Sequence, residues 1–258
     1  MNAMTMISKG FAQSTAVCMT HNIAKVQAGP NQICPKCAVD FVNSNNQTHQ
    51  QNVDRDVREK HFSGAMIPNR YKESGFKNYN VNPDLNGQAN AKNQCIQFTK
   101  NFIDGSRKNL ILVGSTGTGK THLSIAVART LLNKGLYVRY ITSEELAQRI
   151  MNAWDKETKD KSEESVIYEF AQYDLLILDE YGLHDREKRL ELVHKVLYAR
   201  YDRKKPTMLI SNLTIEGEKG LKQDLGDRLW SRFQHDGLTL VECNWADQRM
   251  KGLEGGGV

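Results

Sequence analysis

The chain has 258 residues and a formal net charge of +5, a length that suits one main domain and a small second one. Its hydrophobic content of 39% supports a real core. No apolar run approaches the roughly 18 residues of a membrane helix, and the mild basic excess permits nucleic-acid contact without requiring it. The first residues lack the basic start and apolar stretch of a signal peptide. We therefore expect a cytoplasmic protein without a membrane partner, whose reduced cysteines serve as metal ligands or core residues.

Three of the five cysteines lie before residue 40, and with one histidine they form the pattern C-x2-H-x12-C-x2-C. Two ligand pairs with a loop between them are typical of a tetrahedral zinc site with three thiolates and one imidazole. Zinc would also explain how about 40 residues with little core can fold. Incidental cysteines and a redox CxxC are the alternatives, and His49 and His61 are rival ligands with less suitable spacing. The predicted ligands of this structural Zn²⁺ are Cys18, His21, Cys34 and Cys37.

A polar stretch follows the cysteine-rich start. Asn43–Asn52 is low in complexity and predicts a linker or the frayed start of a helix. Asn52–Phe62 could form a short polar helix, and Gly64 and Pro68 then break the pattern. We therefore predict a zinc-binding module with a linker helix over residues 1–65 and a second domain over residues 66–258.

From there short apolar runs alternate with helical stretches. Gly135 is expected to close the first helix, and Thr142 to Glu145 has the form of a capping box that opens another. Short buried strands alternating with helices indicate an α/β fold with a parallel five-stranded sheet and helices on both faces. Cys95 and Cys243 are expected to be buried as small hydrophobic residues. The predicted strands are Leu110–Val113, Tyr137–Ile141, Leu175–Leu178, Met208–Ile210 and Leu238–Cys243.

GSTGTGKT fits the P-loop pattern G-x-x-x-x-G-K-T and lies between a predicted strand and a predicted helix. The glycines let backbone N–H groups turn toward phosphate oxygens, and the helix N-terminus adds positive potential. Lys120 would reach the β- and γ-phosphates, and the Thr121 hydroxyl would bind Mg²⁺. The predicted nucleotide contacts are Gly114, Ser115, Thr116, Gly117, Thr118, Gly119, Lys120, Thr121 and His122.

Two carboxylates end the strand DLLILDE, some 60 residues after the P-loop. Asp179 would hold Mg²⁺, and Glu180 would orient and deprotonate the attacking water. Asn212 ends the next strand and could hold that water or sense the γ-phosphate, although an asparagine in an ordinary turn is the alternative. The predicted reaction is the hydrolysis of a nucleoside triphosphate, most simply ATP.

GDRLWSRF carries two arginines four residues apart, Arg228 and Arg232. Leu221, Leu225, Leu229 and Phe233 repeat every four residues and predict one buried helix face beside them. About 25 residues follow, so we expect no helical lid domain to fold these arginines over their own nucleotide. We therefore predict self-association, with an arginine reaching the γ-phosphate bound by the neighbouring chain. Surface salt bridges are the alternative.

The combined motifs resemble a known family. GSTGTGKTHL, DLLILDEYG, RYDRKKPT, LISN and GDRLWSRF resemble the lidless AAA+ ATPases that load replicative helicases, the DnaC-like loaders, and the related IstB-like transposition helper ATPases. GFKNYNV resembles the short motif that leads into this domain. The resemblance covers about residues 66–250, and it implies Asn212 as the γ-phosphate sensor and Arg232 as the trans-acting finger, with Arg228 as its companion.

The resemblance also implies a DNA-facing helix between the second strand and the DE strand. That stretch holds Arg149 and Trp154, followed by residues 155–161 with mixed charges. An aromatic ring beside cations suits stacking with single-stranded DNA. Lys188 and Arg189 are further candidates, and the alternative is that Trp154 packs in the core beside a solvated charged face.

The resemblance favours an ATP-driven loader that delivers a hexameric replicative helicase onto single-stranded DNA, encoded by a phage or prophage. The cysteine ligands depart from many loaders, whose N-terminal region is helical. By analogy the zinc module would contact the helicase, and DNA binding by that module is the alternative. An IstB-like transposition helper ATPase and a zinc-dependent adaptor with a vestigial ATPase are the competing functions.

Overall fold

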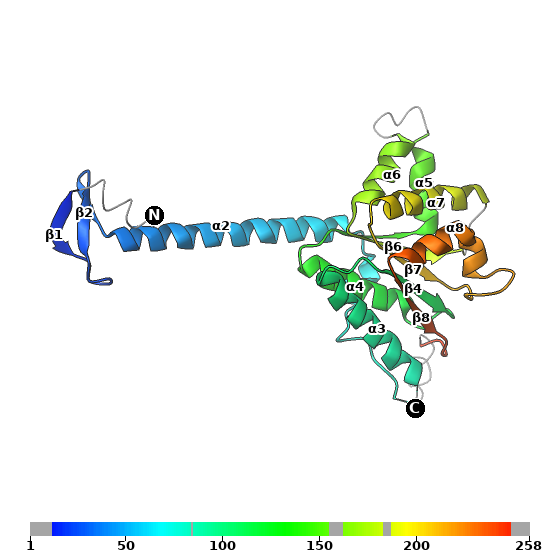
Figure 1. The fold of residues 1–258 in the computed structure, drawn as a ribbon. Helices are drawn as coiled ribbons and strands as arrows, with labels where there is room; N and C mark the ends of the chain where they lie inside the picture. The colour runs from blue at the N-terminus through cyan, green and yellow to red at the C-terminus, as the bar shows by residue number, and fades with distance from the viewer. Residues whose placement is uncertain (1–11, 84, 155–161, 183–186, 249–258) are drawn as a thin grey trace. The chain divides into compact units, whose positions relative to one another are not determined.

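The structure is a computed structural model, and it describes residues 12–83, 85–154, 162–182 and 187–248 (Figure 1). The chain divides into two compact units, one that ends at Val57 and one that begins at Arg58. Within the described ranges, no helix has both the length and the apolar character needed to cross a membrane. The predicted boundary near residue 65 lies just after the last residue of helix α2 and stays a prediction.

Three short antiparallel strands and the start of a long helix build the N-terminal unit. β1 (Gln13–Val17), β2 (Ala24–Ala28) and β3 (Asn31–Ile33) pair in that order. Helix α2 (Pro35–Gly64) follows directly, and a proline suits the first helical position because its ring fixes φ where no N–H is needed. From residue 12 onward, this unit therefore shows one small sheet joined to a helix, with few buried apolar side chains that could form a core.

Helix α2 runs without a break through the polar stretch that the sequence left open as a linker or a helix start. Between Pro35 and Gly64 the sequence contains no proline or glycine to interrupt it. The two segments Asn43–Asn52 and Asn52–Phe62 therefore belong to one helix rather than to a linker and a separate short helix.

The second unit contains the predicted five-stranded parallel sheet, with the strand order β5-β6-β7-β4-β8. Each predicted apolar run forms one strand, which confirms the α/β fold. Because β4 lies inside the sheet between β7 and β8 and its four central residues are buried, the P-loop that follows it starts from a fixed point. The strands are β4 (Asn109–Gly114), β5 (Val138–Thr142), β6 (Leu175–Tyr181), β7 (Thr207–Ser211) and β8 (Leu238–Cys243).

Helices cover both faces of this sheet (Figure 1). Strand β4 shows why, because Leu110 and Leu112 join one hydrophobic cluster with α3 and α4, while Ile111 and Val113 join the other with α5 to α8. Side chains of a strand alternate between faces, so both faces of a central strand must be apolar. The helices are α3 (Asn86–Ile103), α4 (Lys120–Asn133), α5 (Ser143–Asn152), α6 (Glu163–Gln172), α7 (Glu187–Asp202) and α8 (Leu221–His235), and a short 3-10 helix, η1, covers Asn69–Tyr71.

Several local predictions are confirmed. Gly135 adopts φ 81° just after α4, as expected of a residue that closes a helix. Thr142 and Glu145 form the predicted capping box at the start of α5. Cys95 and Cys243 are fully buried in the same cluster. The local signals of this unit therefore agree with its fold.

Helix α8 buries the predicted face but is not one regular helix. Leu221, Leu225, Leu229 and Phe233 are all buried. Gly226 has φ 69° and ψ 159°, so it interrupts the helix between the second and third of these residues. Only a glycine adopts such a conformation without steric cost, and the two arginines therefore lie on the segment after the break.

Strand β5 lies at the edge of the sheet, where its outer side would expose unpaired backbone groups. The residue that follows α2 partly covers it, because the Ala65 carbonyl accepts a hydrogen bond of 2.9 Å from the Tyr140 N–H. The Arg139 guanidinium also donates to the Gly64 carbonyl. The end of α2 is thereby fixed to the same strand that supplies Tyr140 to the site described next.

Candidate functional site

The P-loop connects β4 to α4 in the expected way. Gly119 precedes the helix with φ 89°, and a Cβ there would lie 2.9 Å from the Tyr79 ring. Glycine at this position is therefore required by both backbone and space. The Lys120 ammonium donates to the carbonyls of Gly114 and Ser115 at 2.7 Å each, so the loop holds its lysine close to its own backbone.

A cavity of about 580 Å³ opens between the P-loop and the carboxyl ends of β6 and β7. It brings together predicted residues from three separate motifs, as expected where parallel strands end side by side. Gly114 and Ser115 line an adjoining cavity of about 400 Å³, and Asn212 borders both. The first cavity is lined by Thr116, Gly117, Thr118, Gly119, Lys120, Thr121, His122, Asp179, Glu180 and Asn212, together with Arg70, Tyr71, Ile210, Ser211 and Gln248.

Asp179 is the buried acid of this cavity, with 3% of its surface exposed. Its Oδ2 accepts hydrogen bonds from the Thr121 hydroxyl at 2.9 Å and from the Tyr140 phenol at 2.8 Å. Two oxygen ligands that occupy neighbouring positions on an octahedral Mg²⁺ lie about 2.9 Å apart, because each bond is about 2.0–2.1 Å. The pair Thr121 and Asp179 therefore fits the predicted Mg²⁺.

Tyr140 is a site residue that the sequence did not single out. It comes from the middle of β5 and is 5% exposed, so it resembled an ordinary core residue. Burial, with the Asp179 charge as a second cause, raises the pKa of its phenol well above the ordinary value. The hydroxyl therefore stays protonated and can only donate to the carboxylate.

Glu180 interrupts the regular backbone conformation inside β6. Its φ of 57° lies in the left-handed region, and the pairing of β6 with β7 loses its regular register between Leu178 and Tyr181. Such a conformation costs about 1–3 kcal/mol in a non-glycine residue. Asp179 Oδ1 accepts from the Glu180 N–H at 2.8 Å and the Ser143 hydroxyl donates to the Glu180 carbonyl at 3.1 Å, so both neighbours hold the backbone in place. The exposed carboxylate lines the cavity.

The P-loop is also fixed from outside by aromatic side chains. The Thr118 carbonyl accepts hydrogen bonds from the Tyr79 phenol at 3.3 Å and from the Trp245 indole at 3.0 Å. The His122 ring forms a 3.0 Å hydrogen bond with the Gly75 carbonyl. The segment GFKNYNV therefore packs against the P-loop, whereas Trp245, which follows the last strand, was missed because a single tryptophan after a strand carries no motif.

The two arginines of α8 do not line the nucleotide cavity of their own chain. Arg228 is exposed, and among the described residues it forms no ion pair. Arg232 is half-buried and lines a different cavity with Tyr201, Lys204 and Asp236. The structure therefore does not bring these arginines together with Lys120 within one chain.

The predicted DNA-contacting residues lie partly together. Trp154 is 43% exposed, so the alternative in which it packs in the core is wrong. Its indole donates to the Glu163 carboxylate at 2.6 Å, and the Lys188 ammonium lies 5.0 Å from the ring centroid. Arg189, next to Lys188 on α7, forms an ion pair with Glu144 of α5 at 3.0 Å.

Arg149 points elsewhere, because its guanidinium contacts the Met66 sulfur at 3.0 Å. Residues 155–161, the charged stretch named with this group, lie outside the described residues. The structure therefore groups Trp154 and Lys188 and separates Arg149 from them.

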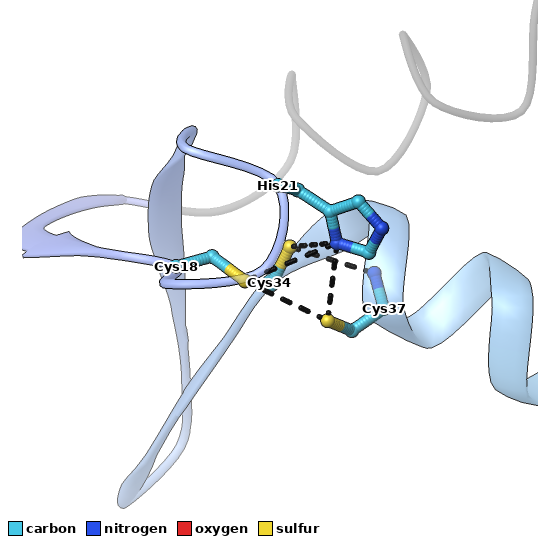
Figure 2. A group of neighbouring side chains, drawn as sticks. All are labelled: Cys18, His21, Cys34 and Cys37. Atoms are coloured by element: carbon cyan, nitrogen blue, oxygen red, sulfur yellow. Dashed lines mark hydrogen bonds between the residues drawn. The ribbon is translucent and has the colours of Figure 1, made fainter.

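The N-terminal unit brings the four predicted zinc ligands into one cluster (Figure 2). Their ligand atoms all lie within 4.8 Å of one another. The Cys18 and Cys37 sulfurs are 3.7 Å apart, and the His21 Nδ1 lies 3.3–3.9 Å from the sulfurs of Cys18, Cys34 and Cys37. Ligands of a tetrahedral zinc ion lie about 3.5–3.8 Å apart, given bonds of about 2.3 Å to sulfur and 2.0 Å to nitrogen. The cluster therefore fits Zn²⁺.

A carboxylate outside the four predicted ligands supports this cluster. The other ring nitrogen of His21, Nε2, lies 3.1 Å from the Asp40 carboxylate. This arrangement fixes the tautomer and orientation of a metal-binding histidine, with Nδ1 facing the ion. Asp40 was missed in the sequence because it lies outside the ligand pattern, although its position one turn after Cys37 places it on the same side of α2.

The backbone also prepares the sulfurs for a cation. The His21 backbone N–H is the main cause that lowers the pKa of the Cys18 thiol to about 6, against the opposing effect of burial. The hydrogen bond to the Cys18 sulfur is the main cause that raises the pKa of the Cys37 thiol to about 11, and burial is the second cause. Because a metal ligand must be a thiolate, binding of a divalent cation would release the Cys37 proton.

Comparisons with known proteins agree with this geometry. A family model described as "IstB-like ATP binding protein" matches residues 35–248. The replicative helicase loader DnaC of Escherichia coli (strain K12) is 28% identical over 191 residues, which cover 74% of this chain and 75% of DnaC. The uncharacterized protein YdaV of the same strain is 29% identical over 192 residues, 74% of each chain.

Two solved structures share the fold. The crystal structure of the DnaC helicase loader matches with a TM-score of 0.59 and 24% identity, over 68% of this chain and 99% of that one. The replication initiator DnaA, bound to AMPPCP and single-stranded DNA, matches with a TM-score of 0.56 and 24% identity, over 74% of this chain and 55% of that one. The five-stranded unit therefore has the AAA+ ATPase fold.

Proposed function

The chain belongs to the family of IstB-like ATP binding proteins and is a replication-related AAA+ ATPase, and from this premise we propose that it loads a hexameric replicative helicase onto single-stranded DNA. The observation that carries the proposal is the similarity to a helicase loader along three quarters of both chains. Loading would take place in the bacterial cytoplasm. The phage or prophage source stays a prediction.

The nucleotide cavity supports the hydrolysis of ATP as follows. Lys120 would exchange the two P-loop carbonyls for β- and γ-phosphate oxygens. Glu180 would take a proton from a water molecule as that water attacks the γ-phosphorus and the bond to the leaving ADP oxygen breaks. Asn212 would orient the same water from the end of β7. Thr121 and Asp179 would hold Mg²⁺, which neutralises phosphate charge when bound.

Arg232 would complete the site of a neighbouring chain. Neither Arg228 nor Arg232 lines the cavity of its own chain, which supports a role at an interface between copies. An arginine supplied in trans raises hydrolysis by about 10³ to 10⁵. Arg232→Ala should therefore abolish most hydrolysis and leave ATP binding near normal, and full hydrolysis by this variant would refute the assignment.

Trp154 would stack with a base of single-stranded DNA, with Lys188 and Arg189 near the phosphates and Arg149 as the outlying candidate. Its ring is exposed, and its indole N–H is already held by Glu163. Stacking on an aromatic ring contributes about 1–3 kcal/mol per base, so Trp154→Ala should weaken binding about fivefold to 150-fold. Tyr168→Ala is a matched control, because Tyr168 is also exposed and lies beneath a cation, Arg203. Equal losses in both variants would remove Trp154 from the DNA surface.

The zinc cluster would fold the N-terminal unit and present it to the helicase. All four ligand positions are filled by protein atoms, which suits a structural rather than a catalytic metal. The decisive experiment is co-purification of the full chain with the hexameric helicase of its host, with Cys34→Ser as the variant that should lose it. Recovery of DNA but no helicase by the N-terminal unit would favour the DNA-binding alternative.

The family description favours one competing function, a helper ATPase for a transposase. A pull-down from host cells separates the two, because a loader should recover the replicative helicase and a helper should recover a transposase. Recovery of transposase alone would overturn the loader. The adaptor with a vestigial ATPase is the weaker alternative, because it has no use for the acid pair at the end of β6.

A further inference from the structure

Two tyrosines of α7 contact the guanidinium of Arg232. The carbon at the centre of its guanidinium lies 4.6 Å from the centroid of the Tyr198 ring and 4.7 Å from that of Tyr201. The two tyrosines are three residues apart, so they project from the same side of α7 on successive turns. Contact with two rings at once restricts how far the guanidinium can turn.

The groups that contact the Arg232 guanidinium are aromatic rings and not carboxylates. The guanidinium of Arg232 has ring faces rather than a carboxylate against it, and no ion pair with an acid is found for it among the described residues. A carboxylate would occupy the N–H groups and cancel the charge. Ring faces attract the cation and leave the N–H groups at its edge able to donate to phosphate oxygens.

The surroundings of Arg232 are also suited to an anion. Arg107 and Lys204 line the same cavity and are exposed, while Asp236 is the only carboxylate in its lining. Lys205 lies there too, but its ammonium pairs with Asp174 at 2.7 Å. This cavity is small, about 20 Å³, so it would not admit a phosphate group. The cations around its rim would instead attract a triphosphate carried by an approaching copy.

One of the rings is fixed in turn from α8. The Tyr201 hydroxyl forms a 2.7 Å hydrogen bond with the His235 Nδ1, and the two rings lie 5.8 Å apart. His235 follows Arg232 by one helical turn. Helix α8 therefore carries the arginine and also, through His235, fixes the position of the Tyr201 ring. Arg228 is exposed, and no aromatic ring among the described residues lies against its guanidinium.

We propose that Tyr198 and Tyr201 are positioning residues, which hold the Arg232 guanidinium oriented and charged for the γ-phosphate bound by a neighbouring copy of the chain. This inference rests on the proposed role of Arg232. It also explains why Arg232 rather than Arg228 serves as the finger, because only Arg232 is restrained before the neighbour arrives.

The first test compares substitutions that remove a ring with those that keep it. Tyr198→Leu combined with Tyr201→Leu should lower kcat for ATP about tenfold and leave KM for ATP near the wild-type value, because neither tyrosine lines the chain's own nucleotide cavity. Tyr198→Phe should keep kcat within about twofold, since the ring face remains. Tyr168→Leu removes an exposed ring beneath Arg203 and should change neither value.

The second test mixes variants. Lys120→Ala destroys its own P-loop but keeps Arg232 and both tyrosines, so it can complete the site of a double-leucine copy. In the mixture, only the double-leucine copies have an intact P-loop. Adding Lys120→Ala should raise the rate of ATP hydrolysis per double-leucine copy several-fold. A misfolded copy would gain nothing, so recovery would show that the double-leucine variant is folded and lacks only an oriented arginine. The absence of recovery would overturn the proposal.

Different results would contradict the role of Arg232 and the role of the two tyrosines. If Arg232→Ala hydrolyses ATP at the full rate, the trans-acting arginine is wrong and the role of the tyrosines falls with it. If Arg232→Ala is defective and is rescued by Lys120→Ala while the double-leucine variant hydrolyses normally, the arginine role holds and the tyrosines do not position it.

Discussion

The two units of this chain reach a fixed structure by opposite means. Among the described residues up to Val57, few apolar side chains are buried, and two of them, Cys18 and Cys34, are themselves proposed metal ligands. The unit from Arg58 onward has two extensive hydrophobic clusters, one on each face of a parallel sheet. In the first unit a few polar atoms must carry the fold, whereas in the second the apolar core fixes the fold and leaves polar atoms available for chemistry.

Metal removal should therefore destabilise the N-terminal unit and leave the stability of the AAA+ unit unchanged. This is the largest expected effect. Cys34→Ser, or a strong chelator added to the wild-type chain, should unfold the N-terminal sheet, because zinc-binding free energy exceeds the stability of a typical small domain. The AAA+ unit should keep its thermal midpoint. Zinc content and heteronuclear NMR spectra measure both, and a folded N-terminal sheet without metal would contradict the comparison.

The second prediction concerns the AAA+ unit, where chemistry should be lost without loss of fold. Glu180→Gln keeps the shape of the side chain but cannot accept a proton, so kcat should fall by about 10² to 10⁴. The affinity for ATP should change little, because the P-loop and Asp179 are intact. Single-turnover hydrolysis and nucleotide-binding titrations provide the two measurements, and a variant that hydrolyses at near the wild-type rate would show that Glu180 is not the base.

The third prediction returns to the metal unit and tests its outer layer. Asp40→Asn removes the charge behind His21 but leaves the four ligands, so zinc affinity should fall about 10- to 100-fold. Competition with a chromophoric chelator would report the loss. Asp54→Asn, farther along α2, is the matched control, and equal affinities for the two variants would remove Asp40 from the site.

The same contrast explains what could be predicted from the sequence. The zinc ligands and the P-loop are short-range patterns, so spacing alone named Cys18 and Lys120. The five strands followed from apolar runs, whereas their order in the sheet came only from the structure. Residues that meet the site only through the fold were missed, because Tyr140 and Trp245 lie 39 and 127 residues from their partners Asp179 and Thr118 and belong to no motif.

Helix α2 shows the opposite failure, because its polar composition concealed a continuous helix. With little apolar periodicity over Asn43–Asn52, no hydrophobic face indicated where the segment would pack. The break in α8 at Gly226 escaped notice for a related reason, since the four buried residues kept helical spacing across it. Periodicity therefore identified the buried face correctly but not the backbone that presents it.

The smallest expected effect sharpens the comparison, because it asks whether a buried side chain of the edge strand β5 affects the acid at the end of β6. Tyr140→Phe keeps the ring in the hydrophobic cluster and removes only the hydroxyl that donates to Asp179. A hydrogen bond to a charged group contributes about 1.5–3 kcal/mol, but water and the Mg²⁺ that Asp179 is proposed to hold can replace part of it. We therefore expect a fall in Mg²⁺ affinity of about threefold to tenfold, with kcat at saturating Mg²⁺ close to that of the wild type.

Activity measured across a Mg²⁺ titration separates this outcome from a general loss of stability, which would lower activity at every concentration. The matched control is Tyr173→Phe, a buried tyrosine whose hydroxyl lies near Glu169 rather than Asp179. If both variants show the same Mg²⁺ dependence as the wild type, Tyr140 belongs to the core alone, and the division between apolar core and polar site is stricter than the hydrogen bond suggests.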